Sequence, residues 1–196
     1  MAGRRNRGSK WLKSQSKSGA GEPKPARLLL IQRHVLDLTH SKFLSYWKRR
    51  QEGVAYWFGK KSVSDLYDVV LAVVVPKAYH SSGNYEVPVE ETTRMGHMML
   101  DVGLTCLAQI HTHPPGVRQH SGYDDEHAIS TSESFLSLVF QDYGNIRAGD
   151  LEDITVHERR SGQWVVLGDE AKRQRIMIVE DDVDLRVGDL ESRPRR

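Results

Sequence analysis

The sequence is poor in cysteine, with Cys106 the single example among 196 residues. One thiol cannot form an internal disulfide, so a disulfide-stapled fold is excluded and a reducing compartment fits best. Cys106 lies in the apolar stretch LDVGLTCLAQI, where a buried, inert thiol is the natural interpretation. We therefore expect neither a disulfide framework nor a cysteine nucleophile.

Long hydrophobic runs are also missing. The longest, VVLAVVV over residues 69–75, is far too short to cross a bilayer. The basic N-terminal segment is not followed by the apolar stretch that a secretory signal requires. These features predict a cytoplasmic protein without a membrane partner.

Neither sign of charge is in large excess, because the formal net charge is only +2. The fold as a whole therefore makes no case for nucleic-acid binding. Basic residues do gather in residues 1–27, where Ser, Gly and Pro are frequent and Glu22 is the one acid, which predicts a flexible basic arm. Its basic residues are Arg4, Arg5, Arg7, Lys10, Lys13, Lys17, Lys24 and Arg27. A solvated tail is the favoured interpretation, and a nucleic-acid docking arm is the alternative.

Strand-like and helical segments alternate after Leu28, which predicts one α/β domain over residues 28–170. We expect a helix within THSKFLSYWKRR, capped by Ser41, and a long loop over HSSGNYEVPVEETT. A second helix is expected to place Met95, Met98, Met99, Val102 and Cys106 on one face. Residues 171–196 are expected to form a short helix followed by a charged, disordered tail.

The stretch AQIHTHPPGVRQHSGYD contains the most informative pattern. On a strand, residues two apart project to one side, so His111 and His113 can both reach one metal ion. Pro114 and Pro115 then end the strand, and the loop returns at Asp124, whose carboxylate can serve as a third ligand. Three protein ligands with one open position is the arrangement of a catalytic zinc site.

A structural interpretation competes for the same residues. Ser121 and Asp124 also have the spacing of a capping box at the start of a helix. The joint His-x-His-x7-Ser-x2-Asp pattern nevertheless favours a metal site, because His, Ser and Asp rarely combine at that spacing by chance.

The pattern resembles the JAMM (MPN+) signature of the JAB family of zinc metallopeptidases. That family also places a glutamate upstream, at the start of a strand of the form Glu-x-x-Gly-x-Leu-x-Gly. Here EGVAYWFG supplies Glu52 and Gly59 at matching positions, with Ala55 and Trp57 in place of the inner Gly and Leu. The resemblance covers residues 28 to about 170 and implies a curved mixed β-sheet flanked by helices, like that of cytidine deaminases.

The resemblance also implies roles. His111, His113 and Asp124 would bind Zn²⁺, and Glu52 would act as the general base and return the proton to the leaving amine. Ser121 would donate a hydrogen bond to the oxyanion. His120 and His127 flank the motif and could suggest a four-ligand site, but His127, three residues after Asp124, is more typical of a supporting or surface group. Three glutamates in the long loop rival Glu52 as base by residue type alone, namely Glu86, Glu90 and Glu91.

The same loop offers a candidate substrate-binding segment. Tyr85, Val87 and Val89 alternate as in a strand that pairs with an extended peptide, although an ordinary surface hairpin explains the pattern equally well. By resemblance, the substrate is a ubiquitin-like protein or its conjugates, in a prokaryotic pathway with E1-like and E2-like partners that includes antiphage systems. The alternative function is a non-catalytic MPN-type scaffold.

Overall fold

The computed structural model describes residues 27–63, 66–146 and 151–180. Except for Arg27, the basic arm expected over residues 1–27 lies outside these ranges, and so does the chain after residue 180. Among the described residues, no helix has the length and the apolar character needed to cross a membrane.

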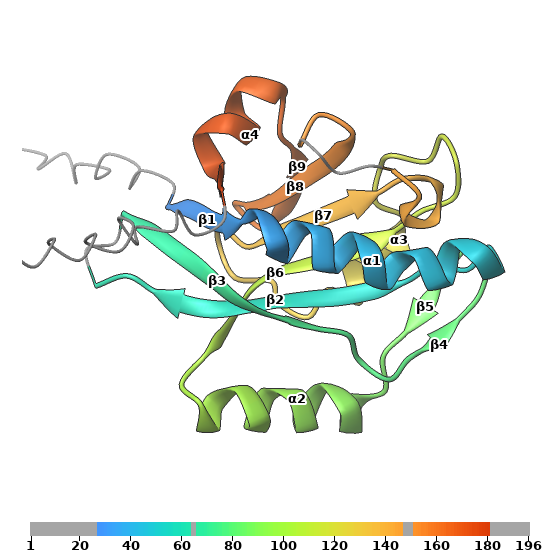
Figure 1. Cartoon of the computed structure of the whole chain (residues 1–196), viewed down its shortest axis with the longest axis horizontal. Helices are drawn as coiled ribbons and strands as arrows, with labels where there is room; N and C mark the ends of the chain where they lie inside the picture. The colour runs from blue at the N-terminus through green and yellow to red at the C-terminus, as the bar shows by residue number, and fades with distance from the viewer. Residues whose placement is uncertain (1–26, 64–65, 147–150, 181–196) are drawn as a thin grey trace, which may run out of the picture.

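A curved, mixed, eight-stranded sheet organises the fold (Figure 1), in the order β10-β1-β3-β2-β6-β7-β8-β9. The pairs β1–β10, β1–β3 and β6–β7 are parallel, and the others are antiparallel. This arrangement confirms the expected mixed sheet flanked by helices. Its strands are β1 (Leu28–Gln32), β2 (Val54–Lys61), β3 (Tyr67–Val74), β6 (Thr105–Thr112), β7 (Leu136–Phe140), β8 (Ile154–Arg160), β9 (Gln163–Val166) and β10 (Ile176–Val179).

The helices cover both faces of the sheet, with α1 on one side and α2 on the other (Figure 1). A separate two-stranded hairpin, β4–β5, precedes α2. The remaining elements are α1 (Arg33–Arg49), β4 (Tyr79–His80), β5 (Tyr85–Glu86), α2 (Val89–Asp101), α3 (Gly122–Glu126), the 3₁₀ turn η1 (Asp142–Gly144) and α4 (Asp169–Arg175).

Strand alternation divides the buried residues into two clusters. On β2, Ala55 and Trp57 face the larger cluster with α1, whereas Val54, Tyr56 and Phe58 face a smaller one with α2. Because successive side chains on a strand point to opposite faces, one strand serves both cores.

Trp57 replaces the smaller residue of the family pattern without disturbing the packing. Its side chain is fully buried, and its indole Nε1 donates to Thr39 Oγ1 at 2.9 Å. The Thr39 hydroxyl in turn donates to the Val35 carbonyl at 2.7 Å, so the buried polar groups are satisfied.

The start of the first helix was predicted too far toward the C-terminus. It begins at Arg33, and Ser41 lies inside it, where its hydroxyl donates to the Leu38 carbonyl instead of capping the helix. Val35, Leu36 and Phe43 are buried on the inner side and extend the helical period further toward the N-terminus than expected.

The prediction of a long loop over residues 80–93 was also wrong. The segment contains β5 and the first residues of α2, which starts at Val89 directly after Pro88. Glu90 and Glu91 lie in the first turn, where acidic side chains stabilise a helix. The apolar face of α2 is narrower than expected: Met95 and Met99 are buried, whereas Met98 and Val102 are exposed and Cys106 belongs to β6.

The C-terminal boundary of the domain needs a similar correction. The short helix expected after residue 170 is present as α4, but the disordered tail does not begin there. Residues Ile176–Val179 form β10, which pairs in parallel with β1 and completes one edge of the sheet. The apolar run IMIV was hidden between charged residues, and a four-residue edge strand leaves little periodic signal.

Candidate metal centre and active site

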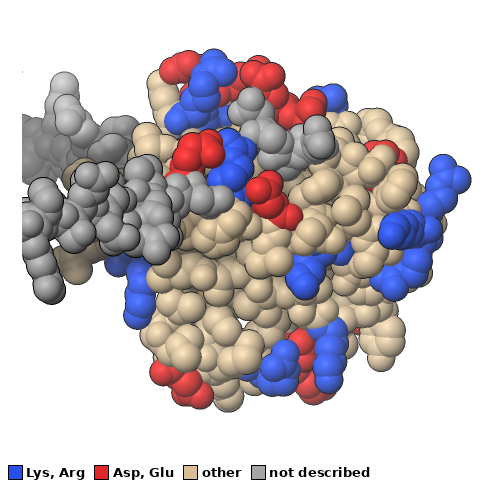
Figure 2. Space-filling view, viewed as in Figure 1, with Lys and Arg blue, Asp and Glu red and all other residues tan. Residues whose placement is uncertain are grey.

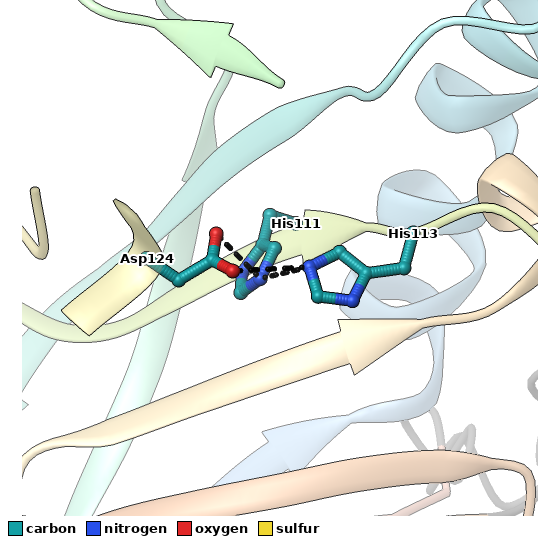
Figure 3. Close-up of side chains that lie close together, drawn as sticks. All are labelled: His111, His113 and Asp124. Atoms are coloured by element: carbon teal, nitrogen blue, oxygen red, sulfur yellow. Dashed lines mark hydrogen bonds and ion pairs between the residues drawn. The ribbon is translucent and has the colours of Figure 1, made fainter. Parts of the chain in front are cut away.

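Three potential ligands converge at one end of the central strands. The strand β6 carries His111 and is followed directly by His113, while Asp124 comes from the short helix α3. All three side chains point toward one another (Figure 3), and each is at most 3% exposed. Within the described residues, they form the one group of three His, Cys, Asp or Glu side chains spaced to hold a metal ion.

The distances within this group match tetrahedral coordination. The Nε2 atoms of His111 and His113 are 3.1 Å apart, and each lies 3.3 Å from an oxygen of Asp124. An ion that holds its ligands tetrahedrally at about 2.0–2.1 Å separates them by about 3.3 Å. The donor atoms therefore surround a space of the size that such an ion needs.

The protonation of the two imidazoles also favours a cation. Two neutral imidazoles whose Nε2 atoms face each other can share only one proton, whereas a metal ion satisfies both nitrogens and the carboxylate together. Burial is the main factor that lowers the pKa of His111, which keeps its ring neutral as metal binding requires. No described residue forms a hydrogen bond with Nδ1 of either ring.

The helix α3 fixes the third ligand through a capping box. The Ser121 hydroxyl and backbone N–H both donate to Asp124 Oδ2 at 2.7 Å, and the Asp124 N–H donates to Ser121 Oγ at 3.3 Å. Burial opposes ionisation of Asp124, but the bonds from His113 and Ser121 outweigh it and hold the pKa of the carboxyl below its usual value. The capping interpretation and the metal interpretation of this motif are thus compatible.

Glu52 lies beside the ligand group, immediately before β2. Its side chain is 4% exposed, and burial raises its pKa from 4.5 to about 7, against the effect of His113 and with a contribution from Asp124. A carboxyl with a pKa near neutrality can both accept and release a proton at physiological pH. This is the electrostatic property that a general base in a metallopeptidase needs.

The backbone of Glu52 is held by the β4–β5 hairpin. Its N–H donates to the Ser81 carbonyl at 2.8 Å, and its own carbonyl accepts from His80 Nδ1 at 2.8 Å. The next residue, Gly53, joins the ladder with β6, because its N–H donates to Thr112 Oγ1 and its carbonyl accepts from the Thr112 N–H. A side chain at Gly53 would collide with Tyr46, since a Cβ there would lie 2.5 Å from its ring.

Two side chains support His111: Gln109, which the sequence analysis did not single out, and Tyr85, which it assigned to substrate binding instead. The ring of Tyr85 lies 5.6 Å from that of His111, and its hydroxyl accepts from Gln109 Nε2 at 2.7 Å. Gln109 Oε1 also accepts from the Ile129 N–H at 2.9 Å, which ties the segment after α3 to the ligand strand. Gln109 is two residues before His111, so strand alternation could have placed it on the same face.

On its other side, His111 contacts a second pair of histidines. The His120 ring lies 5.3 Å from that of His111 and stacks on His157 at 3.7 Å. His120 also lies 3.0 Å from Asp125 Oδ1 and from Ser137 Oγ. Burial is the main factor that lowers the pKa of His120 to about 4. The stacked pair is adjacent to His111 through His120, and His157 comes from β8, too distant in sequence to be foreseen.

The remaining candidates lie away from the ligand group. His127 stacks on Tyr123 at the exposed end of α3. Glu86 and Glu90 are exposed, and Glu91 forms an ion pair with Arg94 at 2.7 Å, which with the Lys77 N–H lowers its pKa to about 2. The lowered pKa of Glu91 contrasts with the raised pKa of Glu52.

The proposed substrate-binding residues do not form the alternating strand that was expected. Tyr85 is buried against the site, Val87 is half-buried and Val89 begins α2. The observed β4–β5 pair is the ordinary hairpin that we kept as the competing interpretation. Its tip is nevertheless close to the site, because it holds Glu52.

Taken together, a buried His–His–Asp group with an adjacent carboxyl of raised pKa is the arrangement typical of metal-dependent hydrolases. Comparisons with known proteins narrow this class. No family model matches the chain. The sequence is 34% identical over 121 residues to the probable metalloprotease y4jG of Sinorhizobium fredii (strain NBRC 101917 / NGR234). The aligned region covers 60% of this chain and 73% of the relative.

One solved structure shares the fold at low identity, and a second is less similar. The solution structure of protein DSY2949 from Desulfitobacterium hafniense gives a TM-score of 0.56 at 11% identity, over 79% of this chain and 94% of that one. AF2198, a JAB1/MPN domain protein from Archaeoglobus fulgidus, gives a TM-score of 0.42 at 15% identity, over 76% and 98% of the two chains.

The similarity to y4jG shows the family: the chain belongs to the metalloprotease family of this relative. Its His-x-His-x7-Ser-x2-Asp motif is that of the JAMM/MPN proteins, and the three ligand residues of the motif are the ones that the fold brings together.

Proposed function

We propose that the protein is a zinc metallopeptidase that hydrolyses the peptide or isopeptide bond after the C-terminal tail of a ubiquitin-like protein. The observation that carries the proposal is the spacing of the His111, His113 and Asp124 donor atoms beside the buried Glu52. The proposal includes a cytoplasmic setting with E1-like and E2-like partners, which rests on the family resemblance.

The donor set favours zinc. Two imidazoles and one carboxylate leave one of four tetrahedral positions open, as in catalytic zinc sites. When bound, zinc supplies the Lewis acidity that activates water near neutral pH and polarises the scissile carbonyl.

The protein's own groups then have distinct tasks. Glu52 takes a proton from the attacking water and delivers it to the leaving amine, a role suited to its pKa of about 7. Ser121 keeps Asp124 oriented through its hydroxyl. Turned toward the substrate, the same hydroxyl can donate to the oxyanion, because the Ser121 side chain is exposed.

A cavity of about 220 Å³ beside the site supports the proposal that the substrate is an extended peptide. It lies between β5 and α3, and its lining includes Tyr56, Tyr85, Val87, Tyr123 and Ile129. Its lining also includes Glu86, Thr92 and His127, and a pocket of mixed aromatic, aliphatic and polar character suits a flexible tail better than a folded surface.

The direct experiment measures cleavage of a ubiquitin-like protein fused through its C-terminal tail to a reporter. We expect cleavage by the zinc-loaded protein, its loss after chelation and its return on adding zinc. If the zinc-loaded protein binds the fusion without cleaving it, the scaffold interpretation is favoured instead.

A further inference from the structure

A strained turn follows β7 directly beside the ligand group. Asp142 and Tyr143 have φ values of 48° and 51°, and Gly144 follows at 87°. Left-handed backbone is unfavourable for residues with a side chain and persists where surrounding contacts impose it, often at functional sites. Two such non-glycine residues in succession therefore call for a reason.

The packing around Gly144 shows that the turn is locked in place. A Cβ at this position would lie 2.4 Å from the Cβ of Phe43 and 3.2 Å from Thr112 Cγ2. Gly144 is thus closely packed against α1 and against Thr112 of β6. Its conformation is set by the two elements that flank the site.

Tyr143 links this turn to both halves of the site. Its N–H donates to the His113 carbonyl at 2.8 Å, while the His113 N–H donates to the Phe140 carbonyl at 2.9 Å. At its other end, the Tyr143 hydroxyl donates to the Ser82 carbonyl at 3.0 Å. One buried side chain therefore spans from the backbone of a metal-ligand residue to the β4–β5 hairpin.

The hairpin passes this restraint on to Glu52. Ser82 is adjacent to Ser81, whose carbonyl accepts from the Glu52 N–H and whose N–H donates to Asn84 at 2.8 Å. Thr112 of β6 bonds to the N–H and the carbonyl of Gly53, whereas the N–H and the carbonyl of Glu52 both bond to the hairpin. A displacement of the hairpin tip would therefore act directly on the N–H and the carbonyl of Glu52.

We propose that Tyr143 is a positioning residue that, through the hairpin tip, fixes Glu52 relative to the metal-ligand segment. This inference rests on the proposed function for its catalytic consequence, but the mechanical link can be tested without it. The strain of the left-handed turn is explained by the same role, because this backbone conformation directs one N–H to His113 and the phenol to Ser82.

The test compares Tyr143→Phe with Tyr79→Phe in the full chain. Tyr143→Phe removes only the hydroxyl that bonds to Ser82, whereas Tyr79 is an exposed tyrosine of the same hairpin. Hydrogen–deuterium exchange is followed in peptides that cover residues 79–86 and Glu52, without metal and with zinc. Zinc affinity by chelator competition and the kcat and KM for a ubiquitin-like fusion complete the measurement.

For Tyr143→Phe we expect exchange in residues 79–86 and at the Glu52 amide to accelerate about 3- to 10-fold, the range that one hydrogen bond accounts for. The kcat should fall by a similar factor, with KM and zinc affinity within about twofold of wild type. Tyr79→Phe should change none of these values.

Unchanged exchange in residues 79–86 would overturn the inference, and so would acceleration spread equally over β6 and β7, which indicates general destabilisation. If exchange responds as expected but kcat does not, the hairpin does not position the base. If the wild-type protein cleaves no fusion, the proposed function fails while the exchange result still decides whether the link exists.

Discussion

The two faces of the central sheet are built differently. The face toward α1 carries a continuous apolar cluster with residues from β1, β2, β6, β7 and β8. On the opposite face, apolar packing is confined to α2 and its neighbours, and the same strands present Gln109, His111, Ser137 and His157, all buried. Charged side chains of both signs are scattered over the surface in view, with a basic group at the end of α1 (Figure 2).

This contrast separates the sources of stability and function. Burying polar side chains is unfavourable unless they are paired, so a face rich in buried histidine contributes less to folding than an aliphatic face of equal area. The first face therefore supplies a rigid platform, and the second uses it to hold a metal-binding group in a dry environment. Substitutions on the two faces should have separable effects.

The largest expected effect is on catalysis at the polar face. Glu52→Gln keeps the size of the side chain but cannot accept a proton, so we expect activity to fall about 10²- to 10⁴-fold. Metal content should not change, because Glu52 is not assigned as a ligand. Kinetic assays that compare Glu52→Gln with Glu86→Gln, Glu90→Gln and Glu91→Gln check this expected loss of activity. Near-normal activity in Glu52→Gln, with one of the other three variants inactive, would assign the base to that glutamate.

The counterpart on the apolar face is Trp57→Ala. Removing this fully buried ring should lower the free energy of unfolding by about 3–5 kcal/mol. Zinc affinity of the molecules that remain folded should be close to wild type. Urea unfolding measures the change, with the partly exposed Trp47→Ala as the control. An equal loss from both substitutions would contradict the assignment of Trp57 to the main core.

A smaller effect is expected at the capping box. Ser121→Ala removes the hydroxyl that orients Asp124, and the loss of such a supporting bond typically weakens metal binding about 10- to 100-fold. Ser121→Thr retains a hydroxyl and should bind zinc more tightly than the alanine variant. Chelator competition gives both affinities. Identical affinities for the alanine variant and the wild type would show that Asp124 needs no such support.

The smallest effect concerns pH and the stability of the metal-free protein. Folding raises the pKa of Glu52 from 4.5 to about 7, so the folded state binds more protons than the unfolded state within that window. Stability should therefore fall as pH rises from 4.5 to 7 and stay lower above 7. Glu52→Gln removes this dependence and should raise the Tm by a few degrees at about pH 8 but not at about pH 4, as thermal unfolding with chelator can show. A Tm difference that does not change with pH would contradict the raised pKa.

The convergence of the metal ligands could be predicted because it depends on local geometry. Two histidines on alternate strand positions, and an aspartate fixed by its own cap, need little knowledge of the rest of the chain. Glu52 could be found only through resemblance, since nothing near it in sequence shows that β2 pairs with β6. Strand alternation accounts for Trp57 and Tyr56 facing opposite sides of β2, but it does not indicate that the Thr39 hydroxyl accepts the indole N–H.

Other features depend on contacts between distant residues and left no local signal. Tyr143 meets Ser82 across 61 residues of chain, and β10 pairs with β1 from the far end of the described chain. The helix start at Val89 was missed because its segment is short, polar and interrupted by proline, a composition equally typical of loops. In each case tertiary packing decides the structure.

The most direct test of the account is the zinc content of the purified protein and two variants. His113 contributes one of three ligands, whereas His127 stacks on Tyr123 outside the group. We expect about one zinc per chain in the wild type and in His127→Ala, and a nearly complete loss in His113→Ala, as elemental analysis after zinc loading and gel filtration will show. Full zinc content in His113→Ala, or none in the zinc-loaded wild type, would contradict the metal centre on which the account depends.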